Sequence, residues 1–477
     1  MLPIAKGMVQ LQQIADTEPV KTLAAAFDKA GFEFALVGGP VRDALLGRPV
    51  TDLDFTTNAR PEQTSEVLQS ISKKTWDIGQ AFGTIAARVA GQTVEVTTYR
   101  AEVYHSDSRK PEVSFGDTIE GDLVRRDFTV NALALMLPQM RLVDVAGGLE
   151  HLLGGVLDTP GAPEVSFSDD PLRMLRAARF AGQLGFSVAP RVIAAMAEMA
   201  PRLEIISRER VRDELVKLIN SSRPVPGLRL LAETGLMAQF LPEFDALRNT
   251  QDDQNRHKDV YEHSLTVLEQ AIDLELARRA PEVTEPDTVL RIAALLHDIG
   301  KPPTRRFEKG AVTFYAHDVV GAKMARKRLR ELKFDNDSVK RIAKLVELHM
   351  RFFGYTDAEW TDSAVRRYVR DAGDQLEQLH IITRADVTTK NEKKAARLRR
   401  AYDGLEERIA QLAAEEELAA VRPELDGEQI MQILQIGPGR EVGAAYKFLL
   451  NIRLDEGPIG PEAATRRLLD WWAEQGK

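Results

Sequence analysis

The sequence predicts an α+β fold: a small mixed sheet near the N-terminus, followed by a mostly helical remainder. Short apolar runs of strand length lie at 34–37, 84–89 and 93–99, all within the first 150 residues. Later segments, around 168–180 and 391–422, have helical character instead. The strands are therefore expected in an N-terminal head and the helices in everything that follows.

The first strand leads into a glycine turn and a short helix. The apolar run 34–37 predicts a buried strand. Gly38 and Gly39 allow the backbone to turn and to approach a ligand closely. Pro40 then begins a short helix, and Gly47 ends it. Amphipathic helices are also predicted over 19–30 and 61–71.

Two carboxylates follow this helix. Asp52 and Asp54 flank Leu53 in a second predicted strand, 51–55. Side chains two apart on a strand share a face, at a spacing of about 6–7 Å. Carboxylates so placed repel one another unless a cation lies between them, and Mg²⁺ prefers oxygen ligands. A glycine turn beside such a pair predicts a nucleoside triphosphate site, the alternative being a surface turn with two solvated aspartates.

The stretch Gly38-Gly39-Pro40-Val41-Arg42-Asp43, with Leu45-Leu46-Gly47, Asp52 and Asp54, resembles the nucleotidyltransferases related to DNA polymerase β. It is most similar to the class II CCA-adding enzymes (tRNA nucleotidyltransferases) and their poly(A) polymerase relatives. The resemblance implies a polymerase-β-like head in which Gly38, Gly39 and Arg42 hold the nucleotide. It also implies that Asp52 and Asp54 are catalytic and bind Mg²⁺.

A third acidic residue is expected on a neighbouring strand. The runs 84–89 and 93–99 predict a hairpin across Gly91 and Gln92. Glu95 lies in its second strand, and the resemblance implies that it joins the catalytic pair. A solvent-facing strand glutamate is the alternative.

The segment 99–115 is polar and rich in helix and strand breakers, which predicts a loop. In the family that this sequence resembles, a flexible loop here is needed to add adenosine. Enzymes that add only the two cytidines lack it. The segment therefore favours a complete CCA-adding enzyme.

A second motif, 121–132, contains Arg125, Arg126, Asp127 and Asn131. Adjacent guanidinium groups neutralise phosphate oxygens well. Asp127 and Asn131 would share a face if the segment is helical. The resemblance implies that this motif contacts the phosphates and ribose of the incoming nucleotide, although a surface charge cluster is the alternative for either arginine alone.

Asp170 and Arg173 begin a third motif, three residues apart in a predicted helix. Cytosine and adenine both present an amino donor beside a ring-nitrogen acceptor, which a carboxylate and a guanidinium match. Guanine and uracil present the reverse polarity and would leave buried groups unpaired, at a cost of about 1–3 kcal/mol each. The resemblance implies this base-reading role, and it extends nucleotide binding to Arg176 and Arg179. Asp170 before Pro171 is also a good helix cap.

The remainder of the first half is assigned to scaffolding. Ser207 is a plausible cap for a helix over 206–215. The stretch 224–227, Pro-Val-Pro-Gly, is interpreted as a joint. Near the C-terminus, 437–440 is expected to break a final pair of helices that ends at Trp471 and Trp472.

Histidines and aspartates recur in a fixed order in the second half. Imidazoles and carboxylates presented by helices form first-row metal sites. The series resembles the HD phosphohydrolases, which implies one divalent metal on the first four of its members and a second on the histidine pair. The members are His263, His297, Asp298 and Asp386, with the pair His317 and His349. Mn, Ni, Fe and Mg are equally compatible, and His105, His151, His257 and His380 are expected to have no metal role.

Composition sets outer limits. The 477 residues include no cysteine, which excludes disulfides and thiolate chemistry and favours a cytoplasmic location. No signal peptide or membrane span is apparent. The net charge of −8 is unusual for a protein that binds RNA, but 323–333 and 390–400 are strongly basic.

We therefore expect a nucleotidyltransferase head (1–150), a helical neck and body (151–255), an HD domain (256–390) and a helical tail (391–477). The expected reaction adds C, C and A to the tRNA 3′ end from CTP and ATP, with Mg²⁺; the HD domain would add phosphohydrolase activity. A poly(A) polymerase is the nearest alternative, but 79–83 lacks the paired arginines typical of that branch. Two more distant hypotheses are a protein-modifying nucleotidyltransferase with an HD domain and an RNA-binding module with an inactive site. The oligomeric state stays open.

Overall fold

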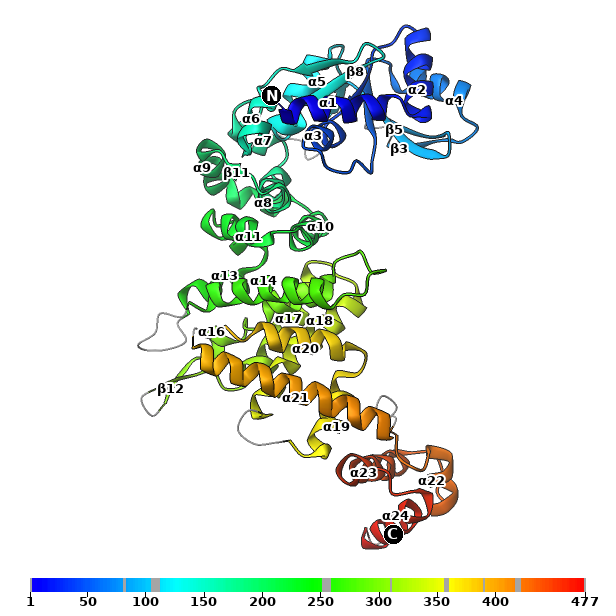
Figure 1. Ribbon diagram of the computed structural model, residues 1–477, viewed down its shortest axis with the longest axis vertical. Coiled ribbons are helices and arrows are strands. Elements are labelled where there is room, and N and C mark those ends of the chain that lie inside the picture. Colours follow the sequence, from blue (N-terminus) through cyan, green and yellow to red (C-terminus); the bar gives the residue numbers. More distant parts are fainter. Residues whose placement is uncertain are drawn as a thin grey trace. The chain divides into compact units, whose positions relative to one another are not determined.

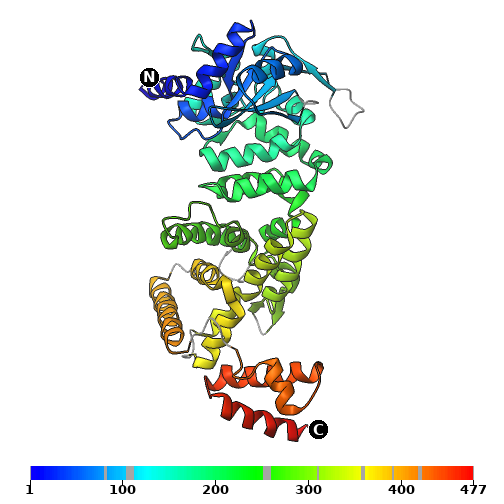
Figure 2. The same cartoon turned by 90° about the vertical axis from the view of Figure 1, so that its right-hand side faces the viewer.

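The computed structural model describes residues 2–79, 83–103, 112–250, 259–308, 311–355, 360–388, 391–416 and 422–475. The chain forms two compact units, Met1–Phe240 and Leu241–Lys477. The first runs from blue to green in Figures 1 and 2, and the second from green to red. The predicted α+β class is confirmed.

The first unit contains a seven-stranded sheet in the order β3-β4-β5-β2-β1-β8-β9. Its strands are β1 (Phe34–Val37), β2 (Asp54–Thr57), β3 (Thr75–Gly79), β4 (Thr84–Val89), β5 (Gln92–Thr98), β8 (Leu133–Leu137) and β9 (Arg141–Asp144). Only β2 and β5 pair in parallel; the other neighbours are antiparallel. The predicted hairpin of β4 and β5 is confirmed, whereas β3 has no predicted counterpart.

Helices surround this sheet. They are α1 (Leu2–Ala15), α2 (Glu18–Lys29), α3 (Gly39–Leu45), α4 (Pro61–Ile71), α5 (Ile119–Val124), α6 (Gly148–Gly154) and the 3-10 helix η2 (Thr129–Asn131). Stacked rings join α2 to the sheet, with centroids 4.6 Å apart for Phe27 and Phe34 and 4.8 Å apart for Phe34 and Phe55. Helices α2, α3 and α4 confirm the helices expected at 19–30, 40–47 and 61–71.

Two local predictions in the head need correction. The strand predicted over 51–55 begins only at Asp54, because its pairing with β5 starts there, and Asp52 lies in the preceding loop. The ends of the predicted loop 99–115 form paired strands, β6 (Arg100–Val103) and β7 (Glu112–Phe115). Residues 104–111 and 80–82 lie outside the described part of the chain.

The rest of the first unit is a stack of helices, visible in Figure 2 as cyan and green coils. It contains β10 (Val156–Leu157), α7 (Pro163–Asp169), α8 (Leu172–Leu184), β11 (Ser187–Val188), α9 (Pro190–Met199), η3 (Ala200–Ile205), α10 (Arg208–Ile219), α11 (Pro224–Glu233) and α12 (Leu236–Phe240). The predicted Ser207 cap is confirmed, since its hydroxyl accepts a bond from the Arg210 backbone N–H.

The joint predicted at 224–227 is wrong, because these residues form the first turn of α11. Proline is tolerated there since the first turn needs no backbone donor. A Cβ on Gly227 would lie 2.3 Å from the carbonyl oxygen of Ala178. The glycine therefore permits α11 to pack closely on α8.

The second unit is almost entirely helical. Its elements up to residue 416 are α13 (Pro242–Asp245), η4 (Ala246–Asn249), α14 (Val260–Arg278), α15 (Thr288–Leu296), α16 (Lys301–Thr304), β12 (Arg306–Glu308), β13 (Ala311–Thr313), α17 (His317–Glu331), α18 (Asn336–Leu348), η5 (His349–Tyr355), α19 (Asp362–Ala372), η6 (Gly373–Gln375), α20 (Leu376–Ala385) and α21 (Glu392–Glu416). Helices α14, α15, α18 and α20 pack together, and α17 packs along α18. They hold the histidine series.

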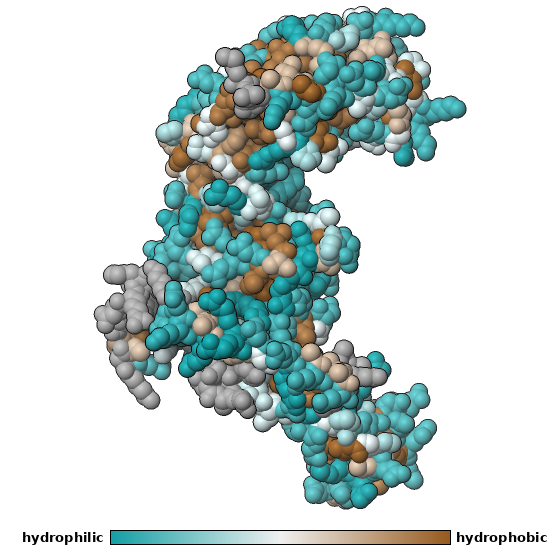
Figure 3. All heavy atoms as spheres, in the orientation of Figure 1, coloured by the Kyte–Doolittle hydropathy of each residue, from teal (hydrophilic) through white to brown (hydrophobic). Residues whose placement is uncertain are grey.

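Three helices end the chain: α22 (Gly427–Leu434), α23 (Arg440–Glu456) and α24 (Pro461–Glu474). They enclose a small core of their own, and Figure 3 shows a mostly hydrophilic visible face there. The predicted break before Arg440 is confirmed, because α23 starts there, but the predicted pair of helices is wrong: a second break separates α23 from α24, which ends at Glu474. Among the described residues, no helix combines the length and the apolar character that a bilayer crossing requires.

Candidate functional site

The predicted catalytic carboxylates meet at one place in the head sheet. Asp54 on β2 is the direct partner of Glu95 on the parallel strand β5, so their Cα atoms are about 4.8 Å apart. Asp52 lies two residues before Asp54, and all three side chains are exposed. Sequence spacing alone did not show that Glu95 faces Asp54; strand pairing does.

Their charges disfavour one another. The surrounding protein limits hydration and raises the pKa of Asp54; the negative charge of Asp52 adds to this, and Arg126 opposes it. Limited hydration also raises the pKa of Glu95, with further contributions from Asp54 and Asp52. Asp54 and Glu95, whose ionisation is disfavoured, lie beside Asp52, and a divalent cation among the three carboxylates would relieve their repulsion.

Arg126 joins these carboxylates to the glycine turn. Gly38 has a φ of +75°, and a Cβ there would lie 3.2 Å from Nη1 of Arg126. Asp122, with 1% of its surface exposed, accepts bonds from Arg126 at 3.0 Å and from Arg125 at 3.2 Å. Sequence reasoning did not single out Asp122, although its spacing of three and four residues from the arginines is a signal. It orients both guanidinium groups.

Asp127 is the centre of a buried network. Its Oδ2 accepts a bond from Nε of Arg176 at 2.8 Å, and its Oδ1 accepts one from Asn131 at 3.0 Å. Nη1 of Arg42 donates to Oδ1 of Asn131 at 2.6 Å. Burial opposes ionisation of Asp127, but Arg176 and Asn131 lower its pKa to about 2. These four predicted nucleotide contacts are thus bonded to one another, and they connect α3 to α8.

Asp170 and Arg173 lie at the junction of α7 and α8. Oδ1 of Asp170 accepts the backbone N–H of Leu172 at 3.1 Å, so the capping alternative is realised. Its Oδ2 accepts a bond from Arg210 of α10 at 2.9 Å. Arg173 donates to the Ser166 hydroxyl and to the Arg125 carbonyl, each at 2.8 Å. Arg210, which sequence reasoning placed in the scaffold, therefore contacts the predicted base reader directly.

Arg179 serves packing in this structure. Its Nε donates to the buried carboxylate of Glu214 at 2.6 Å, and its guanidinium lies 4.0 Å from the centroid of the Phe180 ring. It therefore ties α8 to α10. Among the other predicted nucleotide-binding residues, Arg125, Arg126, Asp170 and Arg173 are partly exposed, whereas Gly38 is buried.

A pocket of about 580 Å³ connects the second and third motifs. Its lining includes Arg125, Arg126, Ser166, Asp169 and Arg173. The arginines predicted to bind phosphates thus share one cavity with a predicted base-reading side chain. The size suits a single nucleotide.

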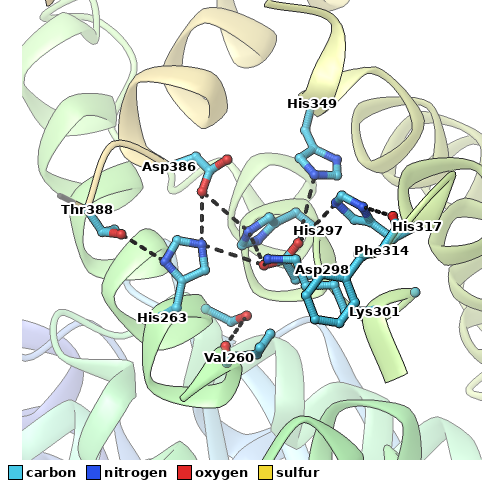
Figure 4. A network of polar contacts seen from close by, with 12 residues as sticks. Val260, His263, His297, Asp298, Lys301, Phe314, His317, His349, Asp386 and Thr388 are labelled. Atoms are coloured by element: carbon cyan, nitrogen blue, oxygen red, sulfur yellow. Dashed lines mark hydrogen bonds and ion pairs between the residues drawn. The ribbon is translucent and has the colours of Figure 1, made fainter. Parts of the chain in front are cut away.

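The histidine series converges in the second unit, as Figure 4 shows. Potential ligand atoms form two groups, each within 4.8 Å: His263, His297 and Asp386, and Asp298, His317 and His349. Asp298 stands between them. Its Oδ2 lies 3.2 Å from Nε2 of His297, and its Oδ1 lies 3.4 Å from Nε2 of His317. The structure therefore groups Asp298 with the histidine pair as closely as with the other members of the series.

Backbone carbonyls orient three of these rings. Nδ1 of His297, His317 and His349 faces the carbonyl oxygens of Ala294, Phe314 and Val346, at 2.6–2.9 Å. A carbonyl can only accept, so each Nδ1 must donate and each neutral ring has a lone pair on Nε2. Those three Nε2 atoms are buried and make no hydrogen bond of good geometry within the described chain. Such atoms fit metal ligands.

The electrostatics agree with a cation site. Burial lowers the pKa of His349 to about 4, which keeps that ring neutral. Burial acts in the same direction on His297, but Asp298 and Asp386 raise its pKa to about 8. Burial opposes ionisation of Asp298, yet His297 and Lys301 hold its pKa well below the usual value. Two contacts were not predicted: Lys301 lies 2.8 Å from Asp298, and the Thr388 hydroxyl lies 3.0 Å from Nδ1 of His263.

The histidines predicted to have no metal role fall into two groups. His151 bonds the Thr129 hydroxyl at 2.9 Å, and His380 is buried beside Tyr368. Neither belongs to a cluster of potential ligands among the described residues. His105 and His257 lie outside those residues.

Comparison with protein families gives three matches along the chain. A poly(A) polymerase head domain matches residues 34–158, a probable RNA and SrmB binding site of polymerase A matches 185–248, and an HD domain matches 260–391. The A-adding tRNA nucleotidyltransferase of Deinococcus radiodurans is 34% identical, over 92% of this chain and 96% of its own length. The CC-adding tRNA nucleotidyltransferase of Thermus thermophilus is 32% identical, over 91% and 93%.

A third relative, the CCA-adding enzyme of Geobacillus stearothermophilus, is 43% identical over 44% of this chain and 51% of its own length. Solved structures share the fold. The Bacillus stearothermophilus CCA-adding enzyme in complex with CTP has a TM-score of 0.66 at 23% identity, covering 100% of this chain and 99% of that one. The Thermotoga maritima CCA-adding enzyme complexed with tRNA has a TM-score of 0.61 at 19% identity, covering 98% of both.

Proposed function

This chain belongs to the family of tRNA nucleotidyltransferases and poly(A) polymerases, and we propose that it adds C, C and A to the 3′ end of tRNA from CTP and ATP. Pyrophosphate is released at each step. The observation that supports the proposal best is the pairing of Asp54 with Glu95, beside Asp52 and Arg126. The absence of cysteine is consistent with work in a reducing cytoplasm.

In the proposed reaction, an in-line displacement, different head residues have different roles. Asp52, Asp54 and Glu95 would hold Mg²⁺, which when bound supplies charge for the triphosphate and activates the RNA 3′-hydroxyl. Arg125 and Arg126, oriented by Asp122, neutralise the phosphates of the incoming nucleotide. The attacking oxygen forms a bond to the α-phosphorus while the bond to pyrophosphate breaks.

Base selection rests on Asp170 and Arg173. To read a base, Asp170 must accept from its amino group and Arg173 must donate to its ring nitrogen. Both side chains have other partners in this structure, but Arg173 uses two of its five N–H donors and each oxygen of Asp170 accepts one bond, so both keep hydrogen-bonding capacity for a base. Arg210 would orient the Asp170 carboxylate through Oδ2, while the Leu172 backbone N–H bonds Oδ1.

Substitution at this pair should change nucleotide choice more than rate. In Arg173→Ala, discrimination of CTP over UTP should fall by about 5- to 150-fold, the equivalent of one unpaired group. The ratio of kcat/KM values for CTP and UTP measures it. Arg202→Ala removes an exposed arginine that bonds the Ser168 carbonyl and should leave the ratio unchanged. An unaltered ratio in Arg173→Ala would assign base reading elsewhere.

The assay for the main proposal uses three tRNA transcripts, ending before the CCA, after one C and after two. Growth to CCA from all three with CTP and ATP, and no further, supports the proposal. Growth only from the CC-ended transcript with ATP would make the protein an A-adding enzyme, as in the Deinococcus relative. Addition of cytidines alone would make it a CC-adding enzyme, and long tails from ATP a poly(A) polymerase.

A second candidate activity belongs to the HD domain. We propose that its two ligand groups hold divalent metal and that the site hydrolyses phosphate esters. The three buried Nε2 atoms without good hydrogen bonds support this. Metal there would lower the pKa of a water molecule. Lys301, which opens onto the same pocket, would neutralise a phosphate oxygen.

A further inference from the structure

The order of the strands in the head sheet separates the two substrates of the proposed reaction. In an in-line displacement the entering and leaving oxygens lie on opposite sides of the phosphorus. The leaving pyrophosphate belongs beside Arg126 and the glycine turn, which directly follows β1. Strand β2, which carries Asp54, has β1 on one side and β5 on the other. The RNA strand that presents the attacking 3′-hydroxyl, here called the acceptor strand, is therefore expected over β5 and β4.

Strands β5 and β4 present two hydroxyl groups beyond Glu95. Thr97 lies two residues after Glu95 on β5, so both side chains share the catalytic face of the sheet. Thr84 of β4 is the direct partner of Thr97, and the two hydroxyl oxygens lie 3.0 Å apart. Both threonines are partly exposed. Because only one of the two hydroxyls donates to the other, the pair keeps a second O–H donor for a ligand.

Arg100 adds a positive charge to this hydroxyl pair. Its Nη2 donates to the hydroxyl of Thr84 at 3.4 Å, and the side chain is partly exposed. Its backbone N–H donates to Oδ1 of Asp122 at 3.2 Å. Asp122 also accepts bonds from the guanidinium groups of Arg125 and Arg126. One buried carboxylate therefore positions cations on both sides of the predicted catalytic carboxylates.

The packing of β6 and β7 against β4 places Arg100 beside Thr84. Arg100 begins β6 and pairs with Phe115 of β7. Gly83, just before β4, has a φ of +77°, and a Cβ there would lie 2.7 Å from the ring of Phe115. Glycine thus lets the ring lie directly against the start of β4. The Arg100 guanidinium is held next to the threonine hydroxyls as a result.

We propose that Thr84, Thr97 and Arg100 bind the last phosphodiester of the acceptor strand, the phosphate that joins its two terminal nucleotides. Guanidinium and hydroxyl groups are common protein donors to phosphate oxygens. Glu95 and Thr97 are about 6–7 Å apart along β5. This spacing is comparable to the length of one nucleotide, so a 3′-hydroxyl near Glu95 brings the phosphate of the same nucleotide close to Thr97. The inference rests on the proposed nucleotide addition and extends it with a binding subsite.

The test makes this one phosphate neutral. Two acceptor RNAs that end before the CCA differ only in their last linkage, a phosphodiester or an uncharged methylphosphonate. Both have 2′-deoxyribose at the penultimate nucleotide, which keeps the linkage stable. For the full-length wild type with CTP and Mg²⁺, the neutral linkage should lower kcat/KM for the acceptor about tenfold, the effect of one charged hydrogen bond. In Arg100→Ala the two RNAs should react almost equally, with the KM for CTP unchanged.

Conservative variants and a matched control separate this role from a structural one. Thr97→Val keeps the shape of the side chain and removes the hydroxyl, so the effect of the neutral linkage should shrink. Arg100→Lys keeps the charge and should restore part of that effect. Arg88 and Thr93 form an exposed cross-strand pair on the same face, four residues farther along each strand. Arg88→Ala and Thr93→Val should keep the full tenfold difference.

Binding in the absence of metal gives a second readout. In EDTA, the dissociation constants of the two fluorescently labelled acceptors, measured by anisotropy, should show the same pattern across the variants. Equal sensitivity of the wild type and Arg100→Ala to the neutral linkage would overturn the inference and leave nucleotide addition intact. So would a loss in Arg100→Ala that occurs only with ATP on an acceptor ending in CC. Absence of any extension by the wild type would overturn both proposals.

Discussion

Asp54→Asn should lower the rate of nucleotide addition to tRNA by roughly 10³-fold or more, because charge stabilisation by a bound metal contributes several kcal/mol to the transition state. Asp54 interacts with the other charged residues of the predicted catalytic site. It pairs with Glu95 across the parallel strands, and Arg126 and Asp52 both act on its charge. An asparagine keeps the shape but provides a weak metal ligand. Single-turnover extension of a tRNA ending in CC, with ATP and Mg²⁺, measures the effect.

The fold should tolerate this change, because Asp54 is exposed and its raised pKa means that its charge is disfavoured in the folded chain. A raised carboxyl pKa makes stability increase as pH falls through that value, so the neutral asparagine removes an unfavourable charge at neutral pH. Thermal unfolding should therefore occur at the wild-type temperature or slightly above it. Asp28→Asn, in helix α2, removes one exposed carboxylate and should keep full activity. Wild-type extension by Asp54→Asn would refute the assignment.

His297→Ala should abolish metal-dependent hydrolysis of p-nitrophenyl phosphate while leaving nucleotide addition intact. The imidazole belongs to one ligand group and lies 3.2 Å from Asp298, which belongs to the other group. Its removal should therefore disturb both groups. We expect the hydrolysis rate to fall by about 10²-fold or more, a larger loss than for a residue that only hydrogen-bonds a metal ligand. Phosphate release with Mn²⁺ or Ni²⁺, before and after chelation, measures it.

Metal binding gives an independent readout of the same prediction. Ni²⁺ or Mn²⁺ should raise the unfolding temperature of the wild type, because a ligand that binds the folded state stabilises it. The rise should be much smaller in His297→Ala. His380→Gln replaces another buried histidine, on α20, and should retain the metal-induced rise. Hydrolysis that survives in His297→Ala would place the activity outside this cluster.

The sequence by itself determined the local elements and the chemistry of the motifs. The strand 34–37, the glycine turn at Gly38 and the helix starts at Ser207 and Arg440 depend on a few adjacent residues, so local physics specifies them. The ordered histidines and aspartates carried the resemblance to the HD phosphohydrolases, and an HD domain matches residues 260–391. The family assignment followed from these motifs and is confirmed by the relatives.

Only the tertiary structure decided which motif residues bond to one another. Arg42, Asp127, Asn131 and Arg176 have the residue types of phosphate and ribose contacts, yet they bond to one another between α3 and α8. Glu95 reaches Asp54 through a parallel pairing that no local pattern encodes.

The physical reason is the range of the interactions. Hydrophobic periodicity and capping act within a few residues, whereas the direction of a guanidinium or carboxylate depends on partners far along the chain. Arg210 and Asp170 are 40 residues apart, and His263 and Thr388 are 125 apart. A long polar side chain satisfies its hydrogen bonds wherever packing places a partner. Its role is therefore set when the elements pack together.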